Sequence, residues 1–176
     1  MIKKVFLFLF LFLLLPSVAF AANLKVDCSG SGCSSSGESP LFSASEVWYP
    51  GKVLTKTFSF KNSSGETREM ALKGHRTSAS SLLEEVFNLS LVCGSKVLWS
   101  GSLESFYSLE KVDIGTFNPG GLAECSIRAS MDPSANNDYQ ELSSVFDLDL
   151  GFWGEPSGKK DSESVGQVLG MGDGVS

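Results

Sequence analysis

The sequence predicts an all-β fold, an antiparallel jelly-roll-like β-sandwich with one or two short helices. Between residues 41 and 153, apolar and polar side chains alternate with a period of two, which is typical of strands that bury one face. Clusters of Gly, Pro, Asn and Ser separate these alternating runs. The connections are long and one helix is inserted, which favours a jelly-roll-like sandwich over an up-and-down barrel.

The first strand of this window is expected at Val53–Asn62, after the turn signal Trp48-Tyr49-Pro50-Gly51. Its residues Phe58 and Phe60 share one face. Gly94, the first residue of a two-residue connection, predicts a hairpin turn. The other expected strands are Arg68–His75, Phe87–Cys93, Lys96–Trp99, Val112–Phe117, Leu122–Met131 and Val145–Trp153.

Two short helices are expected between these strands. Ser80 and Ser81 precede Leu82-Leu83-Glu84-Glu85-Val86, which is typical of an N-cap followed by early-turn carboxylates. Residues 102–109 are expected to form a second helical turn. Because Glu84 and Glu85 are consecutive, they belong to different helix faces and do not form a pair.

The N-terminus has the three parts of a Sec signal peptide: two lysines, the apolar run Val5–Leu15 and small residues ending at Ala21. The alternative is an uncleaved membrane anchor, because the apolar run could be extended toward the length of the shortest spanning helices, roughly 17 residues. The first cysteine, Cys28, does not directly follow the cleavage site, as a lipoprotein would require. We therefore expect residues 1–21 to be removed and the protein to be secreted, extracellular or at the cell surface.

The exported chain is expected to be strongly acidic. Without Lys3 and Lys4, 12 of the 14 basic residues remain against 20 acidic ones, and the net charge moves from −6 to about −8. Such a surface repels nucleic-acid phosphates and anionic headgroups. We expect no nucleic-acid partner and, since no second apolar run follows, no membrane contact after signal cleavage.

All four cysteines lie in the exported part, where oxidising conditions favour pairing. Four cysteines allow three connectivities. The spacing favours a local Cys28–Cys33 bridge and a Cys93–Cys125 bridge across the domain, because the last two fall in the inward phase of their strands. A zinc site is not expected, since the first pair is not Cys-x-x-Cys and the chain has one histidine.

The composition divides the exported chain into three parts. Residues 22–40 begin with a short alternating piece and become rich in Ser and Gly, which is typical of a flexible arm. Residues 41–153 form the expected sandwich domain. Residues 154–176 are Gly, Ser, Lys and Asp with little apolar content and are expected to be a disordered tail.

Catalytic motifs are missing from the sequence. His75 is the single histidine and no Gly-x-Ser-x-Gly elbow or His-Glu-x-x-His motif occurs. Asp147 and Asp149 could act as a glycosidase pair, but their alternation with core residues equally predicts a solvated face. The Gly-x-Gly near residue 30 neither follows a convincing strand nor opens a helix. We therefore expect no enzymatic activity and no bound cofactor.

Two further segments offer binding chemistry. Residues 132–138 (Asp-Pro-Ser-Ala-Asn-Asn-Asp) supply oxygens that calcium prefers, and they also match ordinary turn chemistry. The aromatic side chains that could form a contact platform are Trp48, Tyr49, Trp99 and Trp153. Aromatic residues in a sandwich are more often packed in the core or at an edge.

Three motifs in a fixed order resemble those of the TasA/camelysin-like secreted bacterial proteins, over most of residues 41–153. The first is Trp48-Tyr49-Pro50-Gly51 leading to Phe58-Ser59-Phe60-Lys61-Asn62, the second Leu98-Trp99-Ser100-Gly101-Ser102-Leu103, and the third Asn136-Asn137-Asp138-Tyr139-Gln140 before Val145-Phe146-Asp147. The resemblance implies an exported jelly-roll domain that serves as a subunit of the extracellular (biofilm) matrix or of a surface fibre.

The resemblance also implies assembly in which the N-terminal segment of one subunit adds a strand to the next. In such β-augmentation, main-chain hydrogen bonds give affinity and alternate side chains give register. Head-to-tail addition does not close, so it builds filaments. The donor-strand candidates here are Ala22, Asn23, Leu24, Lys25, Val26 and Asp27. The expected partner is another copy of the chain, forming a homopolymer, or a component of the matrix or cell surface.

The chain departs from the family pattern in its cysteines, and an arm closed by Cys28–Cys33 would donate less freely. Metalloendopeptidase activity, which is ascribed to some members, is not carried over because the chain lacks a His-rich ligand set. The alternative function is a secreted module that binds carbohydrate or a partner protein through the aromatic residues.

Overall fold

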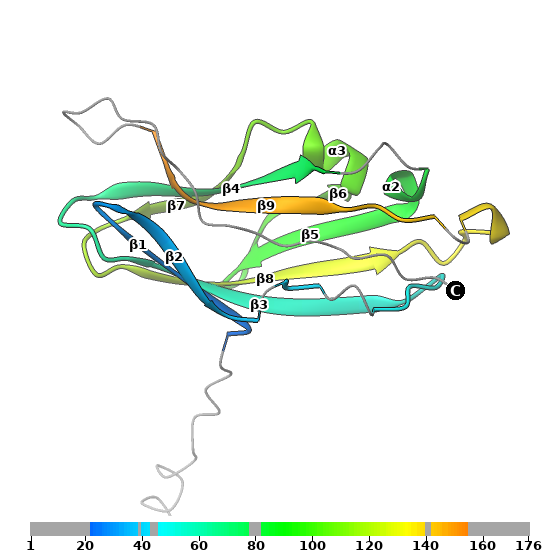
Figure 1. The fold of residues 1–176 in the computed structure, drawn as a ribbon, viewed down its shortest axis with the longest axis horizontal. Coiled ribbons are helices and arrows are strands. Elements are labelled where there is room, and N and C mark those ends of the chain that lie inside the picture. The colour runs from blue at the N-terminus through cyan, green and yellow to red at the C-terminus, as the bar shows by residue number, and fades with distance from the viewer. Residues whose placement is uncertain (1–21, 39, 43–45, 78–81, 140–141, 155–176) are drawn as a thin grey trace, which may run out of the picture.

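A computed structural model gives the fold of residues 22–38, 40–42, 46–77, 82–139 and 142–154. The expected signal peptide, the expected cap at Ser80 and Ser81, and residues 155–176 of the expected tail lie outside these ranges. Two β-sheets pack against each other around one core (Figure 1). The predicted all-β sandwich with short helices is therefore confirmed, and its jelly-roll form stays a prediction.

The larger sheet has six strands in the order β2-β1-β3-β8-β5-β6. Its neighbouring strands are antiparallel except β1 and β3, which run parallel. The strand bounds are β1 Leu24–Ser29, β2 Gly32–Gly37, β3 Val53–Asn62, β5 Phe87–Cys93, β6 Lys96–Ser102 and β8 Leu122–Met131.

The smaller sheet has three antiparallel strands in the order β7-β4-β9. They are β7 Val112–Phe117, β4 Arg68–Arg76 and β9 Phe146–Trp153. Helix α2 (Leu83–Val86) links β4 to β5, and α3 (Leu103–Tyr107) links β6 to β7. Both helices, and the 3-10 turn Asn137–Tyr139 between β8 and β9, therefore lie where the chain crosses from one sheet to the other.

The core forms from the inward phase of the alternating strands, as the period of two predicts. From the large sheet it takes Phe58, Phe60 and Leu91, each at most 1% exposed. Leu148 and Leu150 of β9, at 1% and 2%, face them from the small sheet. Strands β3, β5, β7 and β8 begin and end at the residues predicted from the sequence.

Two smaller expectations need adjustment. Strand β6 continues to Ser102 instead of ending at Trp99, because residues 100–102 still pair with β5. Helix α2 begins after Leu82, which makes no side-chain capping bond. Gly94 has φ +58°, as a tight hairpin turn between β5 and β6 requires.

The expectation of a flexible arm at residues 22–40 is wrong for residues 24–37, which form β1 and β2 of the large sheet. Three inward side chains of β1 are buried, and a disulfide closes the hairpin. The Ser/Gly composition concealed β2 because it is an edge strand, where small exposed side chains are tolerated.

The predicted disulfide pairing is confirmed, with Cys28–Cys33 joining β1 to β2 and Cys93–Cys125 joining β5 to β8. The two bridges differ in the length of chain they close, since their sequence separations are 5 and 32. A longer closed loop removes more entropy from the unfolded chain.

We expect the double variant Cys93→Ala/Cys125→Ala to lower the free energy of unfolding by about 4 kcal/mol, and Cys28→Ala/Cys33→Ala by about 2 kcal/mol. Urea unfolding of the oxidised proteins, followed by tryptophan fluorescence, measures both. A larger loss for the short bridge would contradict the loop-length explanation.

Candidate assembly site: the N-terminal hairpin

The hairpin β1–β2 contains the segment that the sequence suggests as a donor strand. In β1, Leu24, Val26 and Cys28 are 1%, 2% and 0% exposed, while Lys25 and Asp27 face solvent. Strand β1 pairs antiparallel with β2 on one side and parallel with β3 on the other. The donor candidates thus already occupy an internal place in their own sheet.

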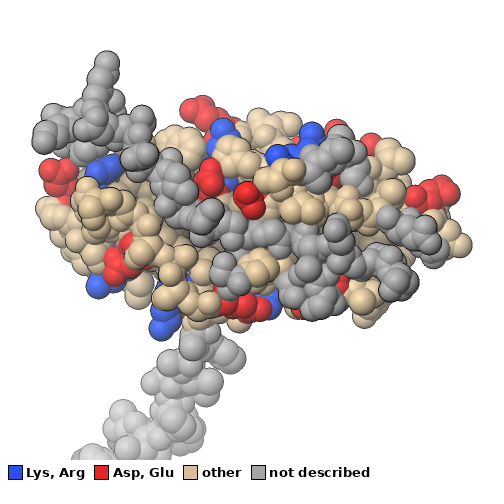
Figure 2. All heavy atoms as spheres, in the orientation of Figure 1, with Lys and Arg blue, Asp and Glu red and all other residues tan. Residues whose placement is uncertain are grey.

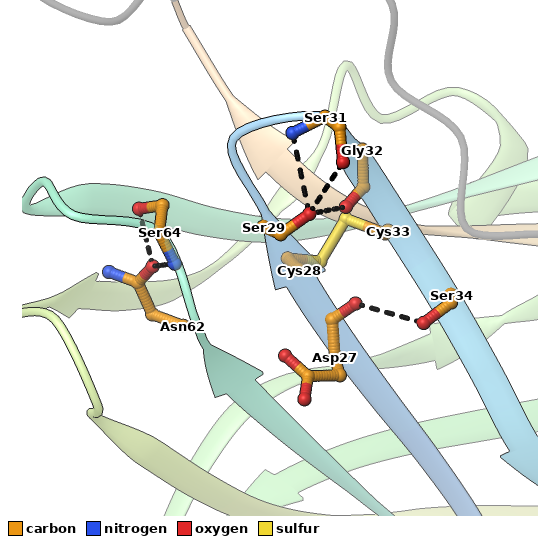
Figure 3. The surroundings of a disulfide bond; sticks show 9 residues. All are labelled: Asp27, Cys28, Ser29, Ser31, Gly32, Cys33, Ser34, Asn62 and Ser64. Atoms are coloured by element: carbon orange, nitrogen blue, oxygen red, sulfur yellow. Dashed lines mark hydrogen bonds between the residues drawn. A yellow bond between two sulfur atoms is a disulfide. The ribbon is translucent and has the colours of Figure 1, made fainter.

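The closed tip of the hairpin rests on the opposite sheet. Cys28–Cys33 lies at this tip (Figure 3), and β1 neighbours β9. A Cβ placed on Gly151 of β9 would stand 3.2 Å from Cys33 Sγ, which is closer than side chains normally approach. Glycine at position 151 therefore leaves room for the disulfide, and the hairpin tip bridges the two sheets at this end.

Asn62, at the end of β3 beside the tip, joins the turn after β3 to the end of β7. Its side chain is 0% exposed and donates to the carbonyl oxygens of Glu66 and Phe117, both at 2.8 Å. Its Oδ1 accepts from the amide and hydroxyl of Ser64 at 3.0 and 2.6 Å (Figure 3). The amide of Ser63 donates to the Cys28 carbonyl at 2.7 Å. The sequence indicated Asn62 only as the end of a strand and as part of the first motif.

The open end of the hairpin is held by a second set of bonds. Asn23 Oδ1 accepts from Thr57 N and Oγ1 at 2.9 and 3.1 Å. The Asn23 carbonyl accepts from the Glu38 amide at 2.7 Å. Gly37 has φ +106° and packs against the Asn23 backbone, so a side chain there would clash. The Glu38 carboxylate pairs with Lys56 Nζ at 2.5 Å.

The outward face of the hairpin is polar, and a weak ion pair joins it to β3. Asp27 and Lys61 of β3 form an ion pair at 3.8 Å, and both side chains are about half exposed. An exposed pair of this kind adds little stability. Strand β2 exposes Ser34, Ser35 and Ser36 and carries no charged side chain. It is the outermost strand on this side of the sheet.

Two of the predicted aromatic contact residues lie together at the start of β3. Trp48 is half-buried and packs edge-on against Phe87, with ring centroids 4.6 Å apart. Lys52 Nζ lies 5.1 Å from the Trp48 ring and 5.9 Å from that of Tyr49, which is 60% exposed. Trp48 is therefore mainly an edge-packing residue.

The other two aromatic residues lie elsewhere. Trp99 packs on Phe106 of α3, with ring centroids 4.9 Å apart. Trp153 ends β9 opposite Glu69, at the end of the small sheet away from Arg76. Arg76 forms an ion pair with Glu84 of α2. Helix α2 directly precedes Phe87, against which Trp48 packs. Trp48 and Trp153 thus lie at opposite ends of the sandwich, and the four aromatic residues do not form one platform.

The predicted carboxylate pair on β9 lies on an outward face. Asp149 Oδ2 is 2.5 Å from His75 Nε2, and Asp147 is opposite His75 in the register. Both His75 and Asp149 are partly exposed. On the face drawn in Figure 2, basic and acidic side chains are interspersed. Asp149 thus forms a surface ion pair with His75.

The oxygen-rich loop considered for calcium uses its oxygens in local turns. Asp132 Oδ1 accepts from the amide and hydroxyl of Ser134 at 2.8 and 2.7 Å, and these bonds lower the pKa of the Asp132 carboxyl. Asn136 Oδ1 accepts from the Asp138 amide at 2.9 Å. Among the described residues, no three His, Cys, Asp or Glu side chains gather in a way that could hold a metal ion.

A buried polar cluster, which the sequence did not indicate, joins α2 to β4. Glu84 is 1% exposed and accepts from Arg76 Nε at 3.1 and 3.0 Å and from Ser144 Oγ at 2.9 Å. The hydrogen bond from Arg76 to Glu84 raises the pKa of Arg76. The guanidinium also lies 4.9 Å from the Tyr107 ring. The neighbouring Glu85 is exposed, as different helix faces predict.

We expect Glu84→Gln to lower the free energy of unfolding by about 2 kcal/mol, because charge-assisted hydrogen bonds to a buried group are removed. Glu85→Gln is the matched control and should stay within about 0.5 kcal/mol of the parent. Urea unfolding at pH 7 compares the two. Equal effects would contradict a structural role for the cluster.

Burial raises the pKa of the Tyr107 phenol, and the neighbouring Ser144 hydroxyl partly offsets this. The buried hydroxyl makes no hydrogen bond of good geometry. The native state thus favours the neutral phenol. Its contribution to stability is complete below the unfolded pKa of about 10 and is lost as pH rises above that value.

We expect Tyr107→Phe to leave stability at pH 7 unchanged or slightly higher, because no well-formed hydrogen bond of the buried hydroxyl is removed. Between about pH 9 and pH 11.5, the variant should lose less stability than the parent. Urea midpoints across this range measure the difference. Parallel declines in the two proteins would contradict it.

Among the described residues, no helix is both long and apolar enough to cross a membrane. The fold and its bridges define a disulfide-bonded β-sandwich, and two disulfides are typical of proteins from oxidising compartments. Searches of protein-family models, curated proteins and solved structures found no match to this chain.

Proposed function

We propose that this protein is a secreted, non-enzymatic structural subunit that forms extracellular fibres by adding its N-terminal strand to a second copy. The observation that carries the proposal is the place of β1. It is a complete strand with an apolar inward face, located at the N-terminal end of the expected mature chain, and it binds β3 along five residue pairs.

Every copy of the chain has the same β3 strand, with which the β1 of any copy can pair. The pairs from Leu24 with Phe58 to Cys28 with Asn62 could be made equally well by the β1 of a neighbour. Exchange of an identical element between copies is a low-cost route to association, because the strand pairing broken in one chain forms again in the next. Head-to-tail exchange does not close and gives filaments.

The remaining features support a structural protein outside the cell. The sequence begins with the pattern expected of a signal peptide, and both disulfides suit an oxidising compartment. Among the described residues, the candidate catalytic side chains His75 and Asp149 form a partly exposed ion pair, which suits a structural surface. The N-terminal hairpin instead offers strand pairing as its means of binding.

A mixture of two single-cysteine variants tests the proposal. Lys25 and Ser59 are paired in the register of β1 and β3, and neighbouring strands lie about 4.8 Å apart, within disulfide reach. We expect the mature Lys25→Cys chain, mixed with the mature Ser59→Cys chain under mild oxidation, to form a mixed disulfide on a non-reducing gel. Filaments should appear by negative-stain microscopy at the same concentrations.

A Lys73→Cys and Asp149→Cys mixture is the matched control, because these positions pair between β4 and β9 within the sandwich. It should give much less mixed product. A wild-type chain that stays monomeric at high concentration in the ultracentrifuge, together with no Lys25→Cys/Ser59→Cys product, would refute the proposed function.

A further inference from the structure

We infer that the unit exchanged between copies is the whole disulfide-closed hairpin, residues 22–37, and not the single strand β1. This inference rests on the proposed function and specifies its moving part. The hairpin comprises β1, β2 and the Cys28–Cys33 bridge. The neighbour receives both strands together, and β2 keeps its place beside β1.

The Cys28–Cys33 disulfide opposes movement of β1 without β2. Cys28 is bonded to Cys33, and all six residues of β1 pair with β2 from Leu24–Gly37 to Ser29–Gly32. Inside the hairpin, Ser29 and Ser31 add further bonds across the turn, and Ser34 Oγ donates to the Asp27 carbonyl (Figure 3). If β1 left without β2, it would lose all of this pairing and would still be tethered at its end.

The attachments of β2 to the rest of the protein are few. It is the outer strand of the sheet, and four of its six residues are exposed. Among the described residues, β2 contacts mainly β1, and Cys33 lies against Gly151 of the other sheet. The bonds that hold the hairpin in place fall mainly on β1 and on its two ends, at Asn23 with Thr57 and at Cys28 with Ser63.

Exchange of β1 and β2 together also keeps the same strand, β2, at the edge of the sheet. If the hairpin moves as a unit, each large sheet again ends in an uncharged serine strand, as it does in the single chain. If β1 moved alone, β2 would lose its partner, and the receiving sheet would end in β1. Unpaired edges favour uncontrolled association, so movement of the intact hairpin keeps the assembly ordered.

The chain after the hairpin limits where the receiving copy can lie. Leu41 and Phe42 are 0% exposed and belong to the core, so the chain is anchored four residues after Gly37. Four residues span at most about 14 Å. With Leu41 in place, the receiving β3 must lie against the donor, which predicts closely packed subunits.

Two engineered cross-links that share one position separate hairpin exchange from strand exchange. Lys25→Cys/Ser36→Cys locks β1 to β2, since these residues are opposite one another in the hairpin. Lys25→Cys/Ser59→Cys locks β1 to β3 of its own chain. Each protein is refolded at low concentration and oxidised, and its monomeric state is checked on a non-reducing gel. It is then concentrated and examined by sedimentation and negative-stain microscopy.

We expect the lock between β1 and β2 to leave filament formation within about twofold of the wild type. The lock between β1 and β3 should reduce it at least tenfold, with recovery after reduction of the engineered bond. If the wild type assembles and the first lock abolishes filaments, β1 leaves alone, and the inference fails while the proposed function stands. If the second lock does not reduce assembly, a different surface joins the copies and both ideas fail.

Discussion

The pairing of β1 with β3 is the interaction on which the rest of the large sheet depends. Leu24, Val26 and Cys28 of β1 close one side of the core, and the strand is fixed at both ends. At one end Asn23 binds Thr57, and at the other the Ser63 amide binds the Cys28 carbonyl. The disulfide at the tip lies against Gly151 of the opposite sheet, so one short hairpin holds together elements from both layers. Without it, β3 would become a bare edge above an exposed apolar groove.

The sequence was sufficient to predict the strands whose side chains alternate strictly. Strands β3, β5, β7 and β8 were located to the residue, and the inward phase of Cys93 and Cys125 gave their bridge. A period of two reports burial of one face and needs no knowledge of the partner strand. The order of strands and the parallel pairing of β1 with β3 depend on which faces meet across the core. A single sequence carries little information on such long-range choices.

The hairpin and the buried cluster show why the remaining features were missed. Strand β2 is Gly-Cys-Ser-Ser-Ser-Gly, a composition that is typical of a flexible linker, and only the bridge and the pairing with β1 make it a strand. Glu84 was correctly separated from Glu85 by helix geometry, but nothing near it in sequence indicates Arg76 or Ser144 as its partners. The aromatic residues were identified as a group by type, while the fold distributes them over both ends of the sandwich.

Under the proposed exchange, the contacts that hold the hairpin in its own chain would also control assembly. Because the closed and exchanged forms share their pairs, the difference in free energy between them comes mainly from the entropy of association and from the connection after Gly37. The balance therefore depends strongly on concentration. The rate depends on releasing both ends of β1 and the tip at Gly151 together, since the disulfide prevents the hairpin from coming apart strand by strand. Under the proposed exchange, the chain would remain a closed monomer when dilute and polymerise where it accumulates, without any change in its covalent structure.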